Sequence, residues 1–109
     1  MRSAKILYKN EEAGELRQLD DGTFEFQYHE NWLNDSSKPA ISLTLPKKKE
    51  IYRSEYLFPF FYNMLPEGTN KQAVCFNLRI DENDHFGIIM ATAKSDTIGA
   101  VRVIKDGEK

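Results

Sequence analysis

The sequence contains a single cysteine, Cys75, and only two histidines, His29 and His85. One cysteine cannot form an internal disulfide, and one cysteine with two histidines is too small a set for a structural zinc site. Cys75 lies within the apolar stretch Ala73–Phe76, where a buried and inert thiol is expected rather than a nucleophile. The composition therefore excludes a disulfide scaffold, and we expect no bound metal.

Long apolar runs and an excess of one charge are also missing. No segment approaches the length that spans a membrane, and residues 1–15 lack the apolar core of a signal peptide. We therefore expect a cytoplasmic protein without a membrane partner. The net charge of −2 provides no overall basic field for nucleic acid. Lys47–Lys49 is the one local basic candidate, and it is expected to form a solvated turn after Pro46.

The sequence has no recognisable set of catalytic residues. Its six glycines are scattered through turns and form no phosphate-binding loop. Serines and threonines lack the motif contexts that activate a nucleophile, and the pair Asp20-Asp21 suits a solvated turn better than an acid–base dyad. His85, beside Asp84, fits a surface position at the start of a helix. We expect neither an enzyme nor a cofactor.

The first half of the chain is patterned as strands. Asp20-Asp21-Gly22 is a strong hairpin signal, because it tolerates the positive φ of a tight turn. Phe24, Phe26 and Tyr28 alternate with Glu25 and Gln27, which places the aromatic rings on one face and the polar side chains toward water. Strands are expected at residues 4–9, 14–19, 23–28 and 40–45, with a short crossing at 29–34. Asn10–Gly14 is expected to form the first turn, and Ile41, Leu43 and Leu45 are expected to share a face.

The second half is patterned as helices. Ser54 is expected to cap a helix that runs to Leu65, with Pro59 restricting its first turns and Pro66 and Gly68 ending it. Thr69–Gln72 fits a capping box for a helix that reaches about Leu78. A third helix follows residues 81–84, residues 95–97 form a loop, 99–104 a last strand and 106–109 a polar tail. This order predicts a single α+β domain over residues 1–109, with an antiparallel sheet.

The segment LFPFFYNMLPEG, residues 57–68, concentrates apolar side chains before an abrupt stop. At helical spacing Leu57, Phe61 and Leu65 share one stripe, which we assign to the core. Phe58 and Tyr62 are then left facing outward, together with Pro66. A helix that is apolar on nearly every side cannot bury all of them against one sheet. Each outward residue is expected either to bind a partner or to pack beneath neighbouring loops.

The turn Pro66–Asn70 joins two expected helices, so its ends are fixed while its tip stays accessible. Glu67 is either a partner for a cation on another protein or a solvated residue before a helix. Gly68 is expected for its backbone conformation. Asp96 is expected to have a structural role in a turn. Our candidate partner-binding residues are Phe58, Tyr62, Pro66, Glu67, Gly68, Thr69 and Asn70.

Four segments, in this order, resemble the N-terminal subdomain of HipA-type kinases, the toxin kinases of bacterial toxin–antitoxin loci. They are GELRQLDDGTFEFQYHENWL, KPAISLTLP, FFYNMLPEG and SDTIGAVRV, and together they cover nearly the whole chain. The most specific are FF-x-N-x-LPEG at residues 60–68 and D-x-x-GA at residues 96–100. In HipA-type kinases a much larger kinase domain follows and carries the catalytic residues. Since the sequence given ends at Lys109, no catalytic residue is carried over.

The resemblance implies a free-standing subdomain like HipS, the small antitoxin of three-component HipBST loci. Such a protein binds a separately encoded HipT/HipA-like Ser/Thr kinase and neutralises it. The alternative is an assembly subunit that completes or activates a split kinase and bridges it to a HipB-like helix-turn-helix repressor. In either case we expect contact with DNA only indirectly, through a complex.

Overall fold

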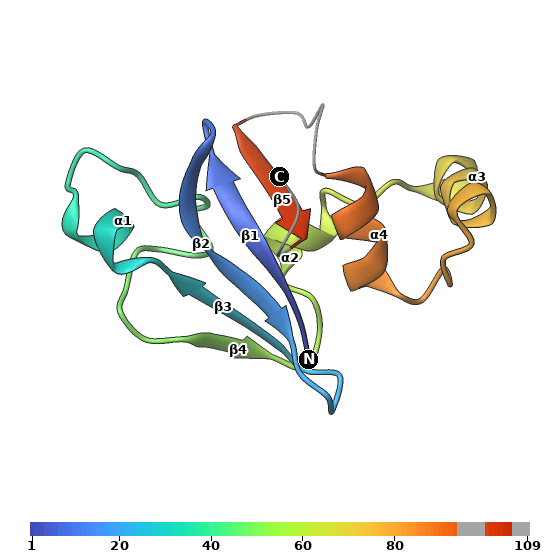
Figure 1. Cartoon of the computed structure of the whole chain (residues 1–109), viewed down its shortest axis with the longest axis horizontal. Coiled ribbons are helices and arrows are strands. Elements are labelled where there is room, and N and C mark those ends of the chain that lie inside the picture. Colours follow the sequence, from blue (N-terminus) through green and yellow to red (C-terminus); the bar gives the residue numbers. More distant parts are fainter. Residues whose placement is uncertain (94–99, 106–109) are drawn as a thin grey trace.

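The structure is a computed structural model that describes residues 1–93 and 100–105. Within these residues the chain forms a five-stranded antiparallel sheet and four helices, which confirms the α+β class (Figure 1). The sheet order is β4-β3-β2-β1-β5. The elements are β1 (Arg2–Tyr8), β2 (Glu11–Gln18), β3 (Phe24–Tyr28), α1 (Glu30–Asn34), β4 (Tyr52–Ser54), α2 (Pro59–Tyr62), α3 (Gly68–Leu78), α4 (His85–Thr92) and β5 (Val101–Lys105).

The first hairpin turns earlier than expected. Lys9 and Asn10 adopt positive φ values of 49° and 69°, and β2 begins directly afterwards at Glu11. Gly14 is therefore inside a strand, and its prediction as part of the turn was wrong. A Cβ on Gly14 would lie 2.5 Å from the carbonyl oxygen of Gln27 on β3. The position requires glycine because two strands approach closely there.

The second hairpin forms as its sequence predicts. Gly22 has a φ of 89°, and its N–H donates to the carbonyl oxygen of Leu19 at 2.9 Å. The Asp21 carboxylate accepts from both the hydroxyl and the backbone N–H of Thr23, at 2.6 and 3.0 Å. These hydrogen bonds lower the pKa of Asp21. The local turn chemistry therefore fixes the register in which β2 and β3 pair.

The expected strand at residues 40–45 is absent, and that prediction was wrong. The segment instead holds a tight turn in which the N–H of Leu45 donates to the carbonyl oxygen of Ser42 at 3.1 Å. Pro39 and Pro46 flank the segment and cannot donate to a strand ladder, which favours a turn. Leu43 is exposed rather than on the buried face. The strand that lies at the edge of the sheet beside β3 is β4, which starts twelve residues after residue 40.

The expected helix from Ser54 to Leu65 was also wrong. Ser54 ends β4, and the helix that forms, α2, contains only residues 59–62. Pro59 is its first residue, a position where a missing N–H leaves no helical hydrogen bond unmade. The prediction of a capping box at Thr69–Gln72 was also wrong, because α3 already starts at Gly68 and no side chain caps it.

The later elements agree better with the sequence. Helix α3 ends at Leu78 as expected. Asp84 caps α4 by accepting a hydrogen bond from the N–H of Gly87 at 3.1 Å. Strand β5 closes the sheet beside β1. The predicted loop at 95–97, Asp96, Gly99 and the tail at 106–109 lie outside the described residues.

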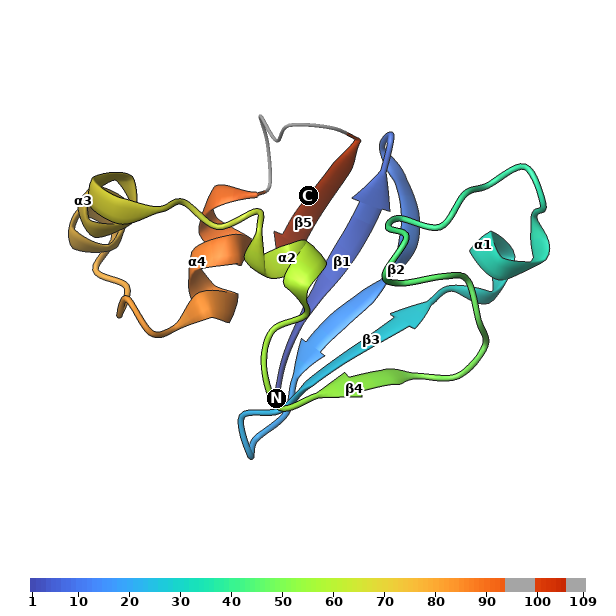
Figure 2. The same ribbon diagram turned by 180° about the vertical axis from the view of Figure 1, so that it is seen from behind.

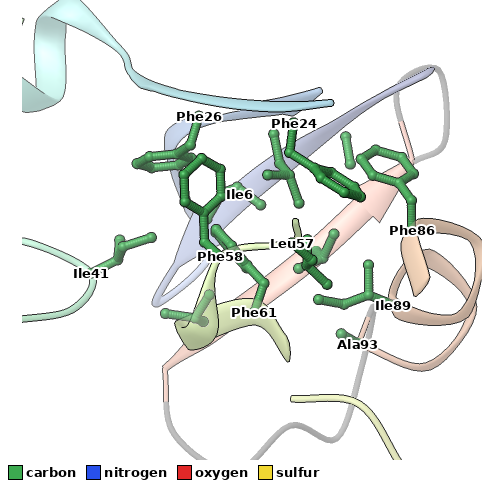
Figure 3. Packing of buried hydrophobic residues seen from close by; sticks show 14 of the residues in the cluster. Ile6, Phe24, Phe26, Ile41, Leu57, Phe58, Phe61, Phe86, Ile89 and Ala93 are labelled. Carbon is green, nitrogen blue, oxygen red and sulfur yellow. The ribbon is translucent and has the colours of Figure 1, made fainter. Parts of the chain in front are cut away.

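Helices α2 and α4 cover one face of the sheet and enclose the core (Figures 2 and 3). The three aromatic residues of β3 are buried in it, as the alternation predicts, and so are Leu57, Phe61 and Leu65. Cys75 is buried at 5% exposure, which confirms that expectation. In the described part of the chain no helix is long and apolar enough to cross a membrane.

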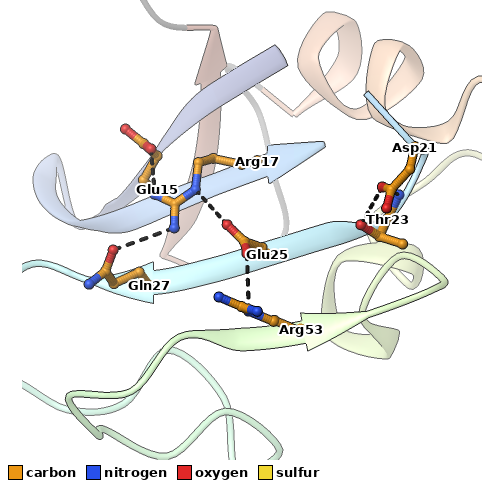
Figure 4. Close-up of polar contacts among 7 residues, drawn as sticks. All are labelled: Glu15, Arg17, Asp21, Thr23, Glu25, Gln27 and Arg53. Carbon is orange, nitrogen blue, oxygen red and sulfur yellow. Dashed lines mark hydrogen bonds and ion pairs between the residues drawn. The ribbon is translucent and has the colours of Figure 1, made fainter. Parts of the chain in front are cut away.

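The opposite face of the sheet is polar, with one departure from expectation. Glu25 points away from the core but is only 9% exposed, because arginines flank it on both sides (Figure 4). Its carboxylate accepts from Arg17 at 3.2 Å and from Arg53 at 3.1 Å. Arg17 also donates to Glu15 at 2.7 Å. This network joins β2, β3 and β4, and its charges are matched within the fold.

Candidate protein-binding surface

Of the predicted binding residues, Tyr62 is placed at the surface. It is the last residue of α2, and half of its side chain is exposed. Its ring meets the ring of His85 edge to face, with centroids 5.4 Å apart. Such a contact orients the tyrosine ring while half of the side chain stays accessible. Tyr62 therefore remains a candidate for contact with a partner.

Phe58 is placed in the core, and its assignment to the outer face was wrong. It is only 7% exposed and contacts the rings of Tyr52 and Phe61, at centroid distances of 6.5 and 6.4 Å. The outward assignment rested on a helix through residues 54–65. Because Phe58 instead precedes α2 in extended backbone, helical spacing does not describe where its side chain points.

The segment Pro66–Asn70 is accessible, but it is a turn only in part, because Gly68–Asn70 already form the first turn of α3. Pro66 is half-buried, while residues 67–70 are exposed. Gly68 has a φ of 56°, a conformation that L side chains rarely adopt, which accounts for glycine at this point. The carbonyl oxygen of Glu67 accepts from the N–H of Asn70 at 3.1 Å, but the Glu67 side chain makes no cap. The carboxylate is thus presented to solvent beside a helix N-terminus.

Sequence reasoning missed the exposed apolar side chains of α3. All eleven residues of this helix are described, and Cys75 is the only one of them that is buried. Phe76 is 84% exposed and Leu78 is 52% exposed. Helix α3 lies at one end of the molecule, beyond α4 and away from the sheet (Figures 1 and 2). Its apolar residues form no stripe, so periodicity gave no signal of a face meant for another protein.

A shallow groove runs beside Phe76 and carries acidic residues. The same residue, Asn83, lines this groove and the hollow next to Tyr62, so the two depressions are neighbours. We call Tyr62, residues 66–70, Phe76 and Leu78 the α3 surface. The groove is lined by Gln72, Cys75, Phe76, Ile80, Asp81, Glu82 and Asn83.

The chemistry of the α3 surface suits binding rather than catalysis. It presents the exposed aromatic rings of Tyr62 and Phe76 and the aliphatic side chain of Leu78, together with the carboxylate of Glu67, and aromatic side chains are enriched at protein interfaces. An isolated helix of this length is marginal in water, and burial of one side chain adds little to its stability. Contact with a second protein would therefore stabilise α3. Among the described residues no cluster of three His, Cys, Asp or Glu side chains is placed to hold a metal ion.

Comparison with known proteins finds relatives that match nearly the whole chain. The family model described as the HipA N-terminal domain matches residues 4–104. An uncharacterized protein of Haemophilus influenzae is 32% identical over 103 residues, which cover 94% of this chain and 92% of that protein. The solved structure "N-terminal domain of HipA toxin" matches with a TM-score of 0.72 and 30% sequence identity, covering 100% of this chain and 96% of that one.

A longer relative carries the same region within a larger protein. The Sinorhizobium fredii protein "Putative kinase Y4mE" is 24% identical over 109 residues, which cover all of this chain but only 26% of that protein. The region described here is thus found both as most of a small protein and as about a quarter of a larger one.

Proposed function

This chain belongs to the HipA N-terminal domain family, and on that premise we propose that it is a non-catalytic antitoxin which binds and restrains a separately encoded HipA-like Ser/Thr kinase. The Haemophilus influenzae relative supports a role apart from a fused kinase, because the match covers 92% of it and leaves no room for a kinase domain. A domain of this kind acts on a kinase only through its surface.

The observation that carries the proposal is the exposed apolar content of α3. Phe76 and Leu78 are well exposed on a helix that buries only Cys75 and that begins in the accessible segment 66–70. Large aromatic side chains are the residues that most often dominate binding energy at protein interfaces. Acidic residues around the groove favour a partner with basic side chains beside an apolar pocket. We place the kinase contact on the α3 surface.

Binding restrains the kinase by one of two routes. The α3 surface either occludes the active-site cleft or holds the kinase in an inactive arrangement of its lobes. Occlusion makes the protein competitive with nucleotide or substrate, whereas an inactive arrangement lowers the turnover rate at saturating substrate. Steady-state kinetics at several inhibitor concentrations distinguishes the two.

The test of binding uses purified protein and a HipA-like kinase that lacks this domain. Titration calorimetry should detect a one-to-one complex. Phe76→Ser and Glu67→Lys should each weaken it, because one removes an apolar anchor and the other reverses a charge on the α3 surface. Glu30→Lys is the matched control, since Glu30 is also exposed at a helix start, at the other end of the molecule. Equal affinities for all four proteins would refute this placement of the contact.

A second function is favoured by the longer relative. Because all of this chain aligns with part of "Putative kinase Y4mE", the domain also occurs inside a longer protein that is described as a putative kinase. A separate copy would then complete a split kinase, or bridge it to a HipB-like repressor on DNA. Under this function the same complex forms, but kinase activity rises or stays unchanged when the protein is added.

A further inference from the structure

Helix α3 has few of the features that hold a short helix together. Of its eleven residues, all of them described, most are poor helix formers: Gly, Thr, Val, Cys, Phe and two Asn. No side chain caps its first turn, no acidic residue lies in that turn, and no basic residue lies in the last one. A helix of this length is marginal in water even with a favourable sequence. The stability of α3 therefore depends on what it contacts.

The rest of the fold holds α3 at few points. Within residues 1–93 and 100–105, no strand and no other helix packs extensively against it, and Figures 1 and 2 show it beyond α4. Cys75 is buried at 5% exposure, and Ile80, just after the helix, is half-buried against the core. The chain is anchored more firmly on either side, by the buried side chains of Leu65 before α3 and of Phe86 in α4. The segment between these two anchors buries little of its own surface.

The end of α3 is closed by a residue in an unfavourable conformation. Arg79 has a φ of 56° and a ψ of 47°, the left-handed region in which a glycine usually ends a helix. The N–H of Ile80 donates to the carbonyl oxygen of Cys75 at 2.9 Å. The N–H of Arg79 donates to the carbonyl oxygen of Phe76 at 3.4 Å. These are the two hydrogen bonds of a Schellman motif, and they hold Arg79 in a backbone conformation that disfavours any residue with a Cβ.

We infer that α3 unfolds locally while the sheet and α4 stay folded, and that the kinase binds only the closed form, in which α3 is helical. Segments with few buried apolar contacts open at free energies well below that of global unfolding. Phe76 and Leu78 keep one fixed arrangement only while the helix is formed, so the kinase selects the closed form. Arg79 shifts the balance toward the open form, because its backbone strain is present only in the closed one. The selection by the kinase rests on the proposed function, whereas the opening of α3 does not.

The single cysteine of the chain reports this opening. Cys75 is buried in the closed form, so iodoacetamide alkylates its thiol only when α3 opens. The free energy of global unfolding comes from urea denaturation followed by the fluorescence of the single tryptophan, Trp32, which is buried at the other end of the molecule. Cys75 of the free protein should be alkylated about tenfold faster, or more, than global unfolding allows, and the rate should change little in low urea.

Two substitutions by glycine within this segment should act in opposite directions. Ala73→Gly, at an exposed position inside α3, should speed alkylation of Cys75 about fivefold, because glycine weakens a helix interior. Arg79→Gly should slow alkylation about fivefold, because glycine adopts the left-handed conformation without strain. Ala91→Gly, in α4, is the control. It should lower the urea midpoint of the whole protein and leave the alkylation rate unchanged, because α4 stays folded when α3 opens.

Alkylation in the complex tests the selection by the kinase. With a HipA-like kinase that lacks this domain present at about 100 times its Kd, alkylation of Cys75, followed by peptide mass spectrometry, should slow about a hundredfold. An unchanged rate while calorimetry reports a complex would overturn the selection of the closed form. If calorimetry detects no complex, the proposed function falls and the selection falls with it, but the opening of α3 in the free protein stands.

The free protein alone can refute the opening. Alkylation no faster than global unfolding allows, or alkylation that Ala91→Gly speeds, would show that α3 unfolds only with the rest of the domain. The proposed kinase contact at the α3 surface would then still stand. If Arg79→Gly speeds alkylation as Ala73→Gly does, the role of Arg79 in the balance is refuted.

Discussion

Replacement of Phe58 by alanine tests where the core ends and the binding surface begins. The Phe58 ring is buried between Tyr52 and Phe61, so truncation leaves a cavity that neighbouring side chains fill only in part. Phe→Ala replacements in protein cores cost about 3–5 kcal/mol in the free energy of unfolding. A chain of 109 residues has about 5–16 kcal/mol in total. Phe58→Ala should therefore remove about a fifth of the stability or more.

Urea denaturation followed by circular dichroism measures this loss. With an m-value of about 1.5–2 kcal/mol per molar urea, the midpoint should fall by about 2 M, with the m-value itself unchanged. Tyr62→Ala is the matched control, because Tyr62 is half exposed and should lose about 1 kcal/mol or less. A midpoint shift for Phe58→Ala no larger than that for Tyr62→Ala would refute the burial of Phe58 and return it to the list of contact residues.

Three further outcomes follow from hydrogen bonds that hold separate elements together. Gly87→Ala should destabilise the protein by about 1–2 kcal/mol, because its Cβ would lie 2.4 Å from the Asp84 carboxylate that caps α4. In a double-mutant cycle with Asp84→Ala, the losses in free energy of unfolding should be non-additive. Additive losses, measured by urea denaturation, would contradict the clash. Hydrogen bonding to Arg2 lowers the pKa of Asp84, so its stabilising effect is present above the unfolded pKa of about 4 and is lost as pH falls through the lower folded value. The midpoint in urea should therefore fall further between pH 5 and pH 2 in the unaltered protein than in Asp84→Asn, and equal falls would contradict the ion pair. Burial raises the pKa of Tyr28 to about 12, so its neutral phenol stabilises the fold below about pH 10, and this stabilisation is lost as pH rises through 12. Ultraviolet titration should therefore show one tyrosine that ionises late and is missing in Tyr28→Phe. Identical titration curves for the two proteins would refute the burial of the Tyr28 hydroxyl between Ile41 and Leu45.

Local turn chemistry made the hairpin between β2 and β3 predictable. Asp20–Gly22 and the alternation through Phe24, Phe26 and Tyr28 depend on residues close in sequence, and both features are found as expected. The segment 40–45 depends instead on a distant group. Its alternation suits a strand, but the Tyr28 hydroxyl binds its two ends and turns the chain between them. No local pattern contains that information.

The binding surface was predictable only in part, for a related reason. The accessibility of residues 66–70 follows from their position between two helices, but the position of Phe58 depended on a helix that does not form. Pro59 was expected to restrict the first turns of a helix that starts at Ser54, and it is instead the first residue of α2. The exposure of Phe76 could not be read from the sequence, since it follows from how far α3 lies from the sheet (Figure 1).

The measurement that tests the central claim most directly is the activity of a HipA-like kinase that lacks this domain, titrated with the purified chain. If the protein is an antitoxin, phosphate transfer should fall linearly and reach a floor at an equimolar ratio, and Phe76→Ser should require a higher concentration for the same inhibition. Activity that stays constant or rises through the equimolar point, while calorimetry reports a complex, would contradict the antitoxin role and identify the protein as a subunit that supports its kinase.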